Sequence, residues 1–322
     1  TENMSEGFLV IDEHTDLLSY NTSALRLLGA EAAGGKRSVL ALNRSEGFRN
    51  AVERSLSGEH SEEIFEREGR YFQIMANPVS REGRVAGAVL IILDITEKHA
   101  QENMRREFTA NVSHELKTPL TSISGTAEII KNGFVKPEDI PHFAGNIYEE
   151  AQRLIALIGD IMRLSQLDED SLPLEKQPVD LYALASSVLH RLEDAAQKKG
   201  ISFALSGQRT IVSGVPQVLD EMIFNLCDNA VKYNRENGHV RVCVSTEQEH
   251  AVLRVEDDGI GIPAADRDRV FERFYRVDKS HSKEIGGTGL GLSIVKHGAM
   301  FHNARVSLES ELGKGTTVTI VF

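Results

Sequence analysis

Apolar residues recur at steps of three and four along two consecutive stretches, and this spacing constrains the fold more than any other feature of the sequence. The first series is Met104, Phe108, Val112, Leu116, Leu120, Ile123, Ala127, Ile130 and Phe134, and the second is Ile140, Ala144, Ile147, Ala151, Leu154, Ile158 and Ile161. Each series predicts an α-helix with one apolar face, and the second is close to a heptad repeat. Turn residues at 132–133 and 136–137 separate the two series, so we expect an antiparallel helical hairpin.

A single hairpin cannot cover both of these apolar faces. If two copies of the chain pair, four helices enclose one apolar core, and the sequence therefore predicts a homodimer built around a four-helix bundle. The alternative is that the apolar faces pack against another domain of the same chain.

The segments on both sides of the hairpin mix helices and strands. Before it, residues 8–12, 17–20, 70–75 and 87–93 are typical of strands, and residues 21–29 of a short helix ending at glycine. After it, expected helices at 181–199 and 215–233 alternate with strands at 240–244, 253–255 and 318–322. Helices against one face of a mixed sheet form an α/β sandwich. We therefore expect a multidomain α+β chain with an α/β domain at 1–97, the hairpin at 98–172 and the sandwich at 173–322.

Composition excludes several classes of protein. The formal net charge of -12 argues against general affinity for nucleic acid, whose phosphates attract basic proteins. The two cysteines, Cys227 and Cys243, fit reduced core residues better than a disulfide, and they lack metal-binding spacing. No apolar run is long enough to span a membrane. The sequence starts at Thr1 without an initiator Met, so we expect a cytoplasmic fragment whose parent protein carries a membrane anchor upstream.

His114 is the first candidate for chemistry. At about 100° per residue, it falls opposite the apolar face of its helix and should point to solvent. Pro119, in mid-helix, should bend the helix just after it. A neutral imidazole is a good nucleophile near neutral pH, and Glu115 could accept a hydrogen bond from its second ring nitrogen. Both residues also fit an exposed helical surface without a role.

Polar and glycine-rich segments in the last domain suit a nucleotide. Asn225, Asn229 and Lys232 lie on one helix face, which fits a phosphate-bound Mg²⁺. Asp257 follows a strand and could accept from an exocyclic amine such as that of adenine, while Gly259 and Gly261 allow close approach to a flat ligand. A tight turn explains that segment equally well.

A second glycine-rich segment, residues 286–291, leads into a helix whose first amides can hold phosphate oxygens. It lacks the Gly-Lys-Ser/Thr ending of a P-loop and does not follow a strand as a dinucleotide fingerprint does. Residues 266–285 between the glycine segments combine basic side chains, including Lys279 and Lys283, with an aromatic cluster. This composition favours a mobile lid over phosphates, because a charged surface loop would not explain the cluster of Phe271, Phe274 and Tyr275.

Taken together, these segments resemble the motifs of bacterial sensor histidine kinases. Residues 114–119 resemble the phosphoacceptor box, 225–233 the asparagine box, 257–261 the first glycine box, 271–276 the phenylalanine box, 287–291 the second glycine box and 313–317 the last one. Residues 6–12, the 21–29 helix and the exit at 94–96 resemble a PAS domain. Six motifs in order over residues 105–322 are a specific combination.

The resemblance implies a dimeric phosphotransfer bundle and a GHKL-type ATP-binding domain. It implies that ATP phosphorylates His114 and that the group then passes to an aspartate of a response regulator. Catalytic roles fall to His114, Glu115 and Thr118, the last placing a water that dephosphorylates the regulator. Metal binding falls to Asn229, which holds Mg²⁺. ATP contacts fall to Asn225, Asn229, Lys232, Tyr233, Asp257, Gly259, Gly261, Arg276, Gly287, Thr288, Gly289, Leu290 and Gly291.

Two other classes share part of this pattern. Other GHKL ATPases, such as gyrase or chaperone relatives, place a general-base Glu where this chain has Asn225, and they lack the His114 helix. A non-enzymatic scaffold with a degenerate kinase would not need intact nucleotide motifs. Both alternatives therefore explain the sequence less completely than a kinase does.

Overall fold

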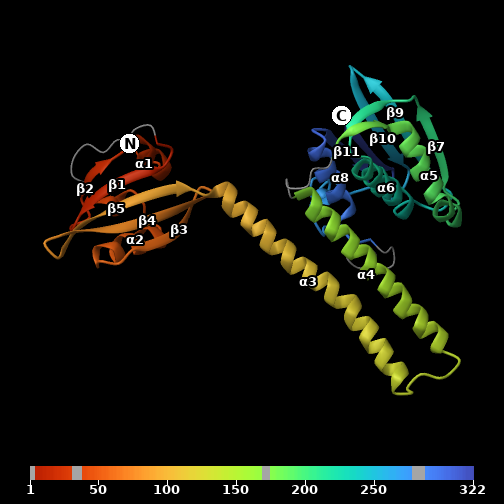
Figure 1. Cartoon of the computed structure of the whole chain (residues 1–322), viewed down its shortest axis with the longest axis horizontal. Coiled ribbons are helices and arrows are strands. Elements are labelled where there is room, and N and C mark those ends of the chain that lie inside the picture. Colours follow the sequence, from red (N-terminus) through yellow and green to blue (C-terminus); the bar gives the residue numbers. More distant parts are fainter. Residues whose placement is uncertain (1–3, 31–37, 169–174, 278–286) are drawn as a thin grey trace. The chain divides into compact units, whose positions relative to one another are not determined.

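A computed structural model describes residues 4–30, 38–168, 175–277 and 287–322 of the chain (Figure 1). The chain divides into two compact units, Thr1–Glu107 and Phe108–Phe322. Lys279, Lys283 and Gly286, which the sequence assigns to the lid and the second glycine segment, lie outside the described residues.

The first unit is built on a five-stranded antiparallel sheet in the order β2-β1-β5-β4-β3. Its strands are β1 (Gly7–Asp12), β2 (Leu17–Tyr20), β3 (Ser61–Arg67), β4 (Arg70–Arg81) and β5 (Arg84–Asp94), with helices α1 (Thr22–Leu28) and α2 (Glu46–Leu56) and the turn η1 (Val39–Ala41). Alternate residues of the central strands are fully buried, including Leu9, Ile74 and Leu90. These side chains form one core with those of the helices.

The local signals read from the sequence are confirmed in this unit. Asn21 caps α1 by accepting a hydrogen bond from the Ala24 amide, because a helix start leaves amides without partners. Gly29 ends the helix in the left-handed conformation with φ 58°. Gly69 and Gly83 have φ angles of 74° and 77° in the turns on either side of β4.

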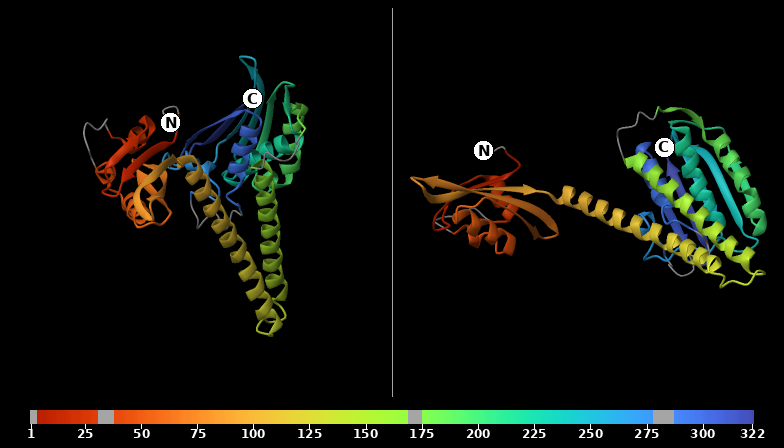
Figure 2. Two further views of the ribbon diagram at one scale, coloured as in Figure 1. Left: turned by 60° about the vertical axis from the view of Figure 1, so that its left-hand side comes forward. Right: turned by 60° about the horizontal axis from the view of Figure 1, so that its bottom comes forward.

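Two long helices follow the sheet, as the apolar spacing predicts. They are α3 (Thr96–Lys131) and α4 (Ile140–Asp168), and in the second unit they run antiparallel as a hairpin (Figure 2). Helix α3 continues through Pro119, whose side chain is buried. A bend at this proline stays a prediction.

The rest of the second unit is a layer of helices on a five-stranded sheet of order β11-β12-β10-β9-β7 (Figure 2). The strands are β7 (Ser202–Gly207), β9 (His239–Glu247), β10 (His250–Asp257), β11 (Arg305–Glu311) and β12 (Gly315–Val321), and the helices are α5 (Leu181–Lys198), α6 (Pro216–Lys232) and α8 (Gly291–Phe301). A small second sheet pairs β6 (Gln177–Asp180) with β8 (Ile211–Gly214), and η2 (Arg269–Phe271) follows β10. Strand β7 is parallel to β9 and the other pairs are antiparallel, so the sheet is mixed as expected.

Buried side chains of α5, α6 and α8 pack against alternate residues of this sheet, among them Val242, Leu253 and Ile320. The two cysteines are free, as expected. Burial raises the pKa of Cys227 to about 12, so this thiol stays protonated at neutral pH. Among the described helices, none has the length and apolar character needed to cross a membrane.

Candidate active site

The predicted nucleophile stands on the surface of α3. His114 is exposed, whereas Glu115 and Leu116 beside it are half-buried, so the helix turns the imidazole to solvent as its position opposite the apolar face predicts. The Thr118 hydroxyl donates to the carbonyl of His114 at 3.2 Å. Thr118 is thus one helical turn from His114 and on the same side of the helix.

Helix α6 carries the predicted asparagine face. The Asn225 side-chain amide donates to the Glu221 carbonyl at 3.0 Å, and Lys232 pairs with Asp228 at 2.7 Å. Within the part of the chain that the structure describes, no residue hydrogen-bonds to the Asn229 side chain. This is the side chain that the sequence assigns to Mg²⁺.

Asp257 is placed at the end of β10, beside the start of β12. Its Oδ1 accepts from the amides of Gly259 at 2.9 Å and Thr316 at 3.3 Å. Burial, which disfavours the charged carboxylate, raises the pKa of Asp257 to about 6 even though both amides favour the ionised form. A half-buried carboxylate with a raised pKa is a good acceptor for a ligand that donates a hydrogen bond to it.

Gly259 and Gly261 leave no room for a side chain. A Cβ on Gly259 would lie 2.4 Å from the Tyr233 carbonyl oxygen, and one on Gly261 would lie 2.1 Å from the Glu311 carbonyl oxygen. Gly261 also has a φ of 65°, which favours glycine. These glycines therefore bring the turn after β10 against Tyr233 at the end of α6.

The second glycine segment, residues 287–291, lies against residues of α6 and the end of that helix. A Cβ on Gly287 would lie 3.2 Å from the Tyr233 hydroxyl, and one on Gly291 would lie 2.8 Å from Asn225 Oδ1. Gly289 has a φ of 73°, and its carbonyl accepts from the Phe274 amide at 2.9 Å. The structure thus brings α6 and the segment 287–291 together at the start of α8.

Arg276 connects this segment to the phosphoacceptor helix. Its guanidinium donates to the Gly287 carbonyl and lies 3.8 Å from Glu115 Oε2. Nearby, Phe274 packs on Phe108 with ring centroids 5.8 Å apart. Phe274 of the aromatic cluster therefore packs on α3 of the same chain.

Leu290 takes a different position from the rest of the segment. Its side chain is fully buried with Leu157, Leu164 and Ile294, so only its backbone can contact a nucleotide. Thr288 donates from its hydroxyl to Asp160 Oδ2 on α4 at 2.7 Å. No sequence pattern pointed to Asp160, because a single acid on the polar face of a helix is indistinguishable from other surface carboxylates.

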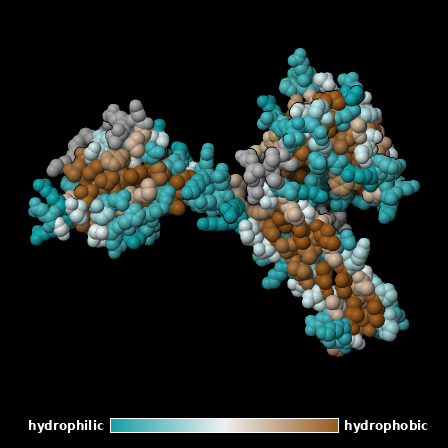
Figure 3. Space-filling model, viewed as in Figure 1, coloured by the Kyte–Doolittle hydropathy of each residue, from teal (hydrophilic) through white to brown (hydrophobic). Residues whose placement is uncertain are grey.

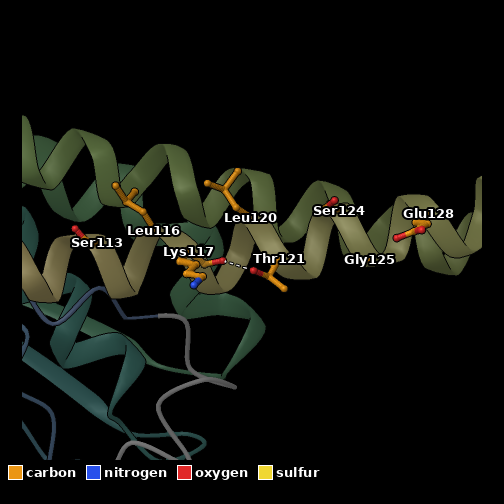
Figure 4. A pocket seen from close by; sticks show the side chains of 8 residues that line it. All are labelled: Ser113, Leu116, Lys117, Leu120, Thr121, Ser124, Gly125 and Glu128. Atoms are coloured by element: carbon orange, nitrogen blue, oxygen red, sulfur yellow. Dashed lines mark hydrogen bonds between the residues drawn. The ribbon is translucent and has the colours of Figure 1, made fainter.

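A groove of about 550 Å³ follows α3 next to His114. Its lining is Ser113, Leu116, Lys117, Leu120, Thr121, Ser124, Gly125 and Glu128 (Figure 4). The two leucines give it an apolar side and the other residues a polar one. Figure 3 shows apolar side chains running along both helices of the hairpin.

Comparison with protein-family models matches three segments in succession. Residues 1–100 match the PAS fold, residues 104–170 match the His Kinase A (phospho-acceptor) domain, and residues 214–322 match the histidine kinase-, DNA gyrase B- and HSP90-like ATPase. The matches follow the predicted order along the chain.

Curated relatives extend over nearly the whole chain. The sensor protein kinase WalK of Staphylococcus aureus is 32% identical over 324 residues, which is 99% of this chain and 78% of that protein. WalK of S. aureus strain JH9 has the same identity, and there the chain spans 53% of the relative's length.

Solved structures share the architecture. Histidine kinase ThkA, solved in complex with the response regulator protein TrrA, matches 98% of this chain and 95% of its own with a TM-score of 0.55 at 21% identity, which shows the fold alone. Full-length ShkA in complex with AMPPNP matches 67% of this chain and 45% of its own, with a TM-score of 0.50 and 27% identity.

Proposed function

Because the chain belongs to the sensor histidine kinase family, we propose that it transfers the γ-phosphoryl group of ATP to His114 and then to an aspartate of a response regulator. One observation carries the assignment of these residues. Arg276 joins the glycine segment, through the Gly287 carbonyl, to Glu115, the neighbour of His114. The nucleotide-binding residues and the phosphoacceptor helix therefore meet in one chain.

The adenine end of the nucleotide fits the segment around Asp257. This carboxylate is half-buried, lies beside two glycines, and has acceptor capacity left after its two amide bonds. An exocyclic amine donating to it would favour the ionised form and lower its pKa. We assign adenine recognition to Asp257, Gly259 and Gly261.

The phosphates fit the space between α6 and the start of α8. Lys232, Tyr233 and Arg276 supply positive charge and donors, and the segment 287–291 leads into α8 at Gly291, where a helix start offers backbone amides to phosphate oxygens. Asn229 and Asn225 would hold Mg²⁺ together with the phosphates. Bound there, Mg²⁺ supplies neutralisation of the phosphate charge.

Transfer of the phosphoryl group depends mainly on how ATP and His114 are positioned. A ring nitrogen of His114 bonds to the γ-phosphorus as the bond to the bridging oxygen breaks, and ADP leaves. Glu115 accepts from the other ring N–H and stabilises the positive charge that develops on the imidazole. The exposure of His114 leaves room for both the nucleotide and, later, the aspartate of the regulator.

We assign the partners to two surfaces of the hairpin. Exposed apolar residues on α4, including Tyr148, Ile155 and Met162 at intervals of seven, fit a second copy of this chain in a four-helix bundle. The groove on α3 from Ser113 to Glu128, next to His114, fits the regulator. A water placed by the Thr118 hydroxyl would let the same surface dephosphorylate it.

These roles agree with a division into a PAS domain at 1–97, a phosphotransfer hairpin at 98–172 and an ATP-binding domain at 173–322. The test is incubation of the chain with Mg²⁺ and γ-labelled ATP, beside a His114→Ala variant. Acid-labile label is expected in the wild type and absent from the variant, because a phosphoramidate hydrolyses in acid. His190→Ala, which removes an exposed histidine from α5, is the matched control and should label normally.

Label that persists in His114→Ala would show that another residue is the nucleophile. If the wild type binds ATP but takes up no label, the chain acts as a scaffold or as a phosphatase of the regulator.

A further inference from the structure

Helix α4 lies against the start of α8, where the phosphates of a nucleotide are expected. Leu157 and Leu164 of α4 are buried with Leu290 and Ile294, and Ile161 and Leu167 pack at the edge of this cluster. The contact therefore covers the second glycine segment with an apolar surface from the hairpin.

A carboxylate from α4 enters this contact. Asp160 Oδ2 accepts from the Thr288 hydroxyl at 2.7 Å, and its side chain is only 15% exposed. Arg163, one turn further along α4, lies 3.4 Å from Asp160 Oδ1 and 2.7 Å from Glu221 Oε1 on α6. Arg163 thus ties α4 to the helix that carries the asparagine face.

Some of the groups around Asp160 belong to the proposed nucleotide site. Burial raises the pKa of Asp160, and it outweighs the Thr288 hydrogen bond and the charges of Arg163 and Lys232, which favour the ionised form. Lys232 and Thr288 are both residues that the proposed function assigns to ATP. Asp160 accepts the hydrogen bond of Thr288 and lies within the electrostatic influence of Lys232, whose direct partner is Asp228.

We propose that Asp160 is a built-in competitor of the nucleotide, with its carboxylate occupying the Thr288 hydroxyl and the field of Lys232 that an ATP phosphate would otherwise take. This inference rests on the proposed function, because it requires ATP to bind at the segment 287–291. Since one hydroxyl proton cannot serve both acceptors, ATP binding and the contact of α4 with this segment oppose each other. Nucleotide binding then releases the ATP-binding domain from α4, and the released domain can bring the nucleotide to His114.

The test is the affinity of the whole chain for AMPPNP with Mg²⁺, measured by calorimetry. Asp160→Ala should bind about tenfold more tightly than the wild type, the ratio expected when one hydrogen bond to a charged group no longer competes. Asp160→Asn keeps the size and an acceptor but not the charge, and should fall between the two. Glu149→Gln removes an exposed carboxylate from the same helix and should leave the affinity unchanged.

Normal binding by the wild type, with equal or weaker affinity in both Asp160 variants, would refute competition and leave the proposed function intact. If neither the wild type nor the variants bind AMPPNP, the proposed function falls and this inference falls with it. Binding that appears only in the Asp160 variants would support the competition in its strongest form.

Discussion

The Arg276 guanidinium lies 3.8 Å from the carboxylate of Glu115, the residue that follows the phosphoacceptor His114. Arg276 is only 11% exposed on its side chain. Burial lowers the pKa of this guanidinium, and the negative charge of Glu115 opposes the shift. Arg276 therefore contacts both Glu115 on α3 and the Gly287 carbonyl of the second glycine segment.

Glu115→Gln should slow autophosphorylation at saturating ATP by about 100-fold, because the developing charge on His114 loses its partner and Arg276 loses its anchor on α3. Nucleotide affinity should change less than about threefold, since Glu115 does not contact the bound phosphates in the proposed arrangement. The measurement is the single-turnover rate of label uptake. Glu128→Gln, an exposed acid further along α3, is the control, and an equal loss there would contradict the role of Glu115.

Nucleotide binding should weaken in acid because Asp257 must be ionised to accept from adenine. With its pKa raised to about 6, the carboxylate is ionised at pH 8 and largely protonated at pH 5. If only the ionised form binds, affinity for ADP should fall about tenfold between these two values. Calorimetric titrations across the range would check this, and Asp257→Asn should bind weakly with no step near pH 6.

The same carboxylate should lower stability above about pH 6. Its pKa is raised from 3.8 in the unfolded chain to about 6 in the fold, so the fold binds more protons and loses stability as pH rises through this window. Asp257→Asn keeps an oxygen that accepts from the Gly259 and Thr316 amides but carries no charge. Its Tm should exceed that of the wild type by a few degrees at pH 8, and the difference should shrink at pH 4.

Gly261 and Gly313 have similar φ angles but differ in the space available for a side chain, so replacing each with Ala tests the effect of steric contact on stability. Gly261 has a φ of 65°, and a Cβ there would lie 2.1 Å from the Glu311 carbonyl oxygen, whereas Gly313 has a φ of 81° and no atom within 4 Å of the added Cβ. Gly313→Ala should therefore cost about 1 kcal/mol for the backbone angle alone. Gly261→Ala should cost about 3 kcal/mol or more, because the Glu311 backbone must also move. Denaturant melts of both variants measure the difference, and equal losses would contradict the steric argument.

Much of the architecture follows from short-range rules that the sequence carries openly. The cap at Asn21, the stop at Gly29 and the alternation along β9 depend on neighbouring residues alone. The exposure of His114 followed from helix periodicity in the same way. The family motifs then placed Asn225, Asp257 and Arg276 in one site, although no local rule links positions so far apart.

The contact between α4 and the glycine segment could not be predicted. The sequence assigned Ile161 to the apolar face of the bundle, yet it packs at the edge of the cluster that Leu157 and Leu164 form with Leu290 and Ile294. Apolar spacing shows which face of a helix is buried and does not show what buries it. Asp160 lies between Leu157 and Leu164 along α4. It contacts Thr288 because α4 packs on the glycine segment.

A second apolar stripe on α4 predicts the state of association. Tyr148, Ile155 and Met162 recur at intervals of seven and are 65%, 62% and 59% exposed. A row of this kind is stable in water only when another helix covers it, so the chain should sediment as a dimer. Ile155→Glu should shift it to a monomer, since pairing would bury a charge in the bundle.

The matched control for this change is Met300→Glu, which places the same charge on α8 at a residue that is 62% exposed and outside the hairpin. It should remain dimeric at the concentration at which Ile155→Glu dissociates. Sedimentation velocity gives both masses, and circular dichroism confirms that each variant is folded. A wild type that sediments as a monomer would leave the stripe uncovered and would contradict the bundle, whereas loss of the dimer in Met300→Glu as well would move the interface away from α4.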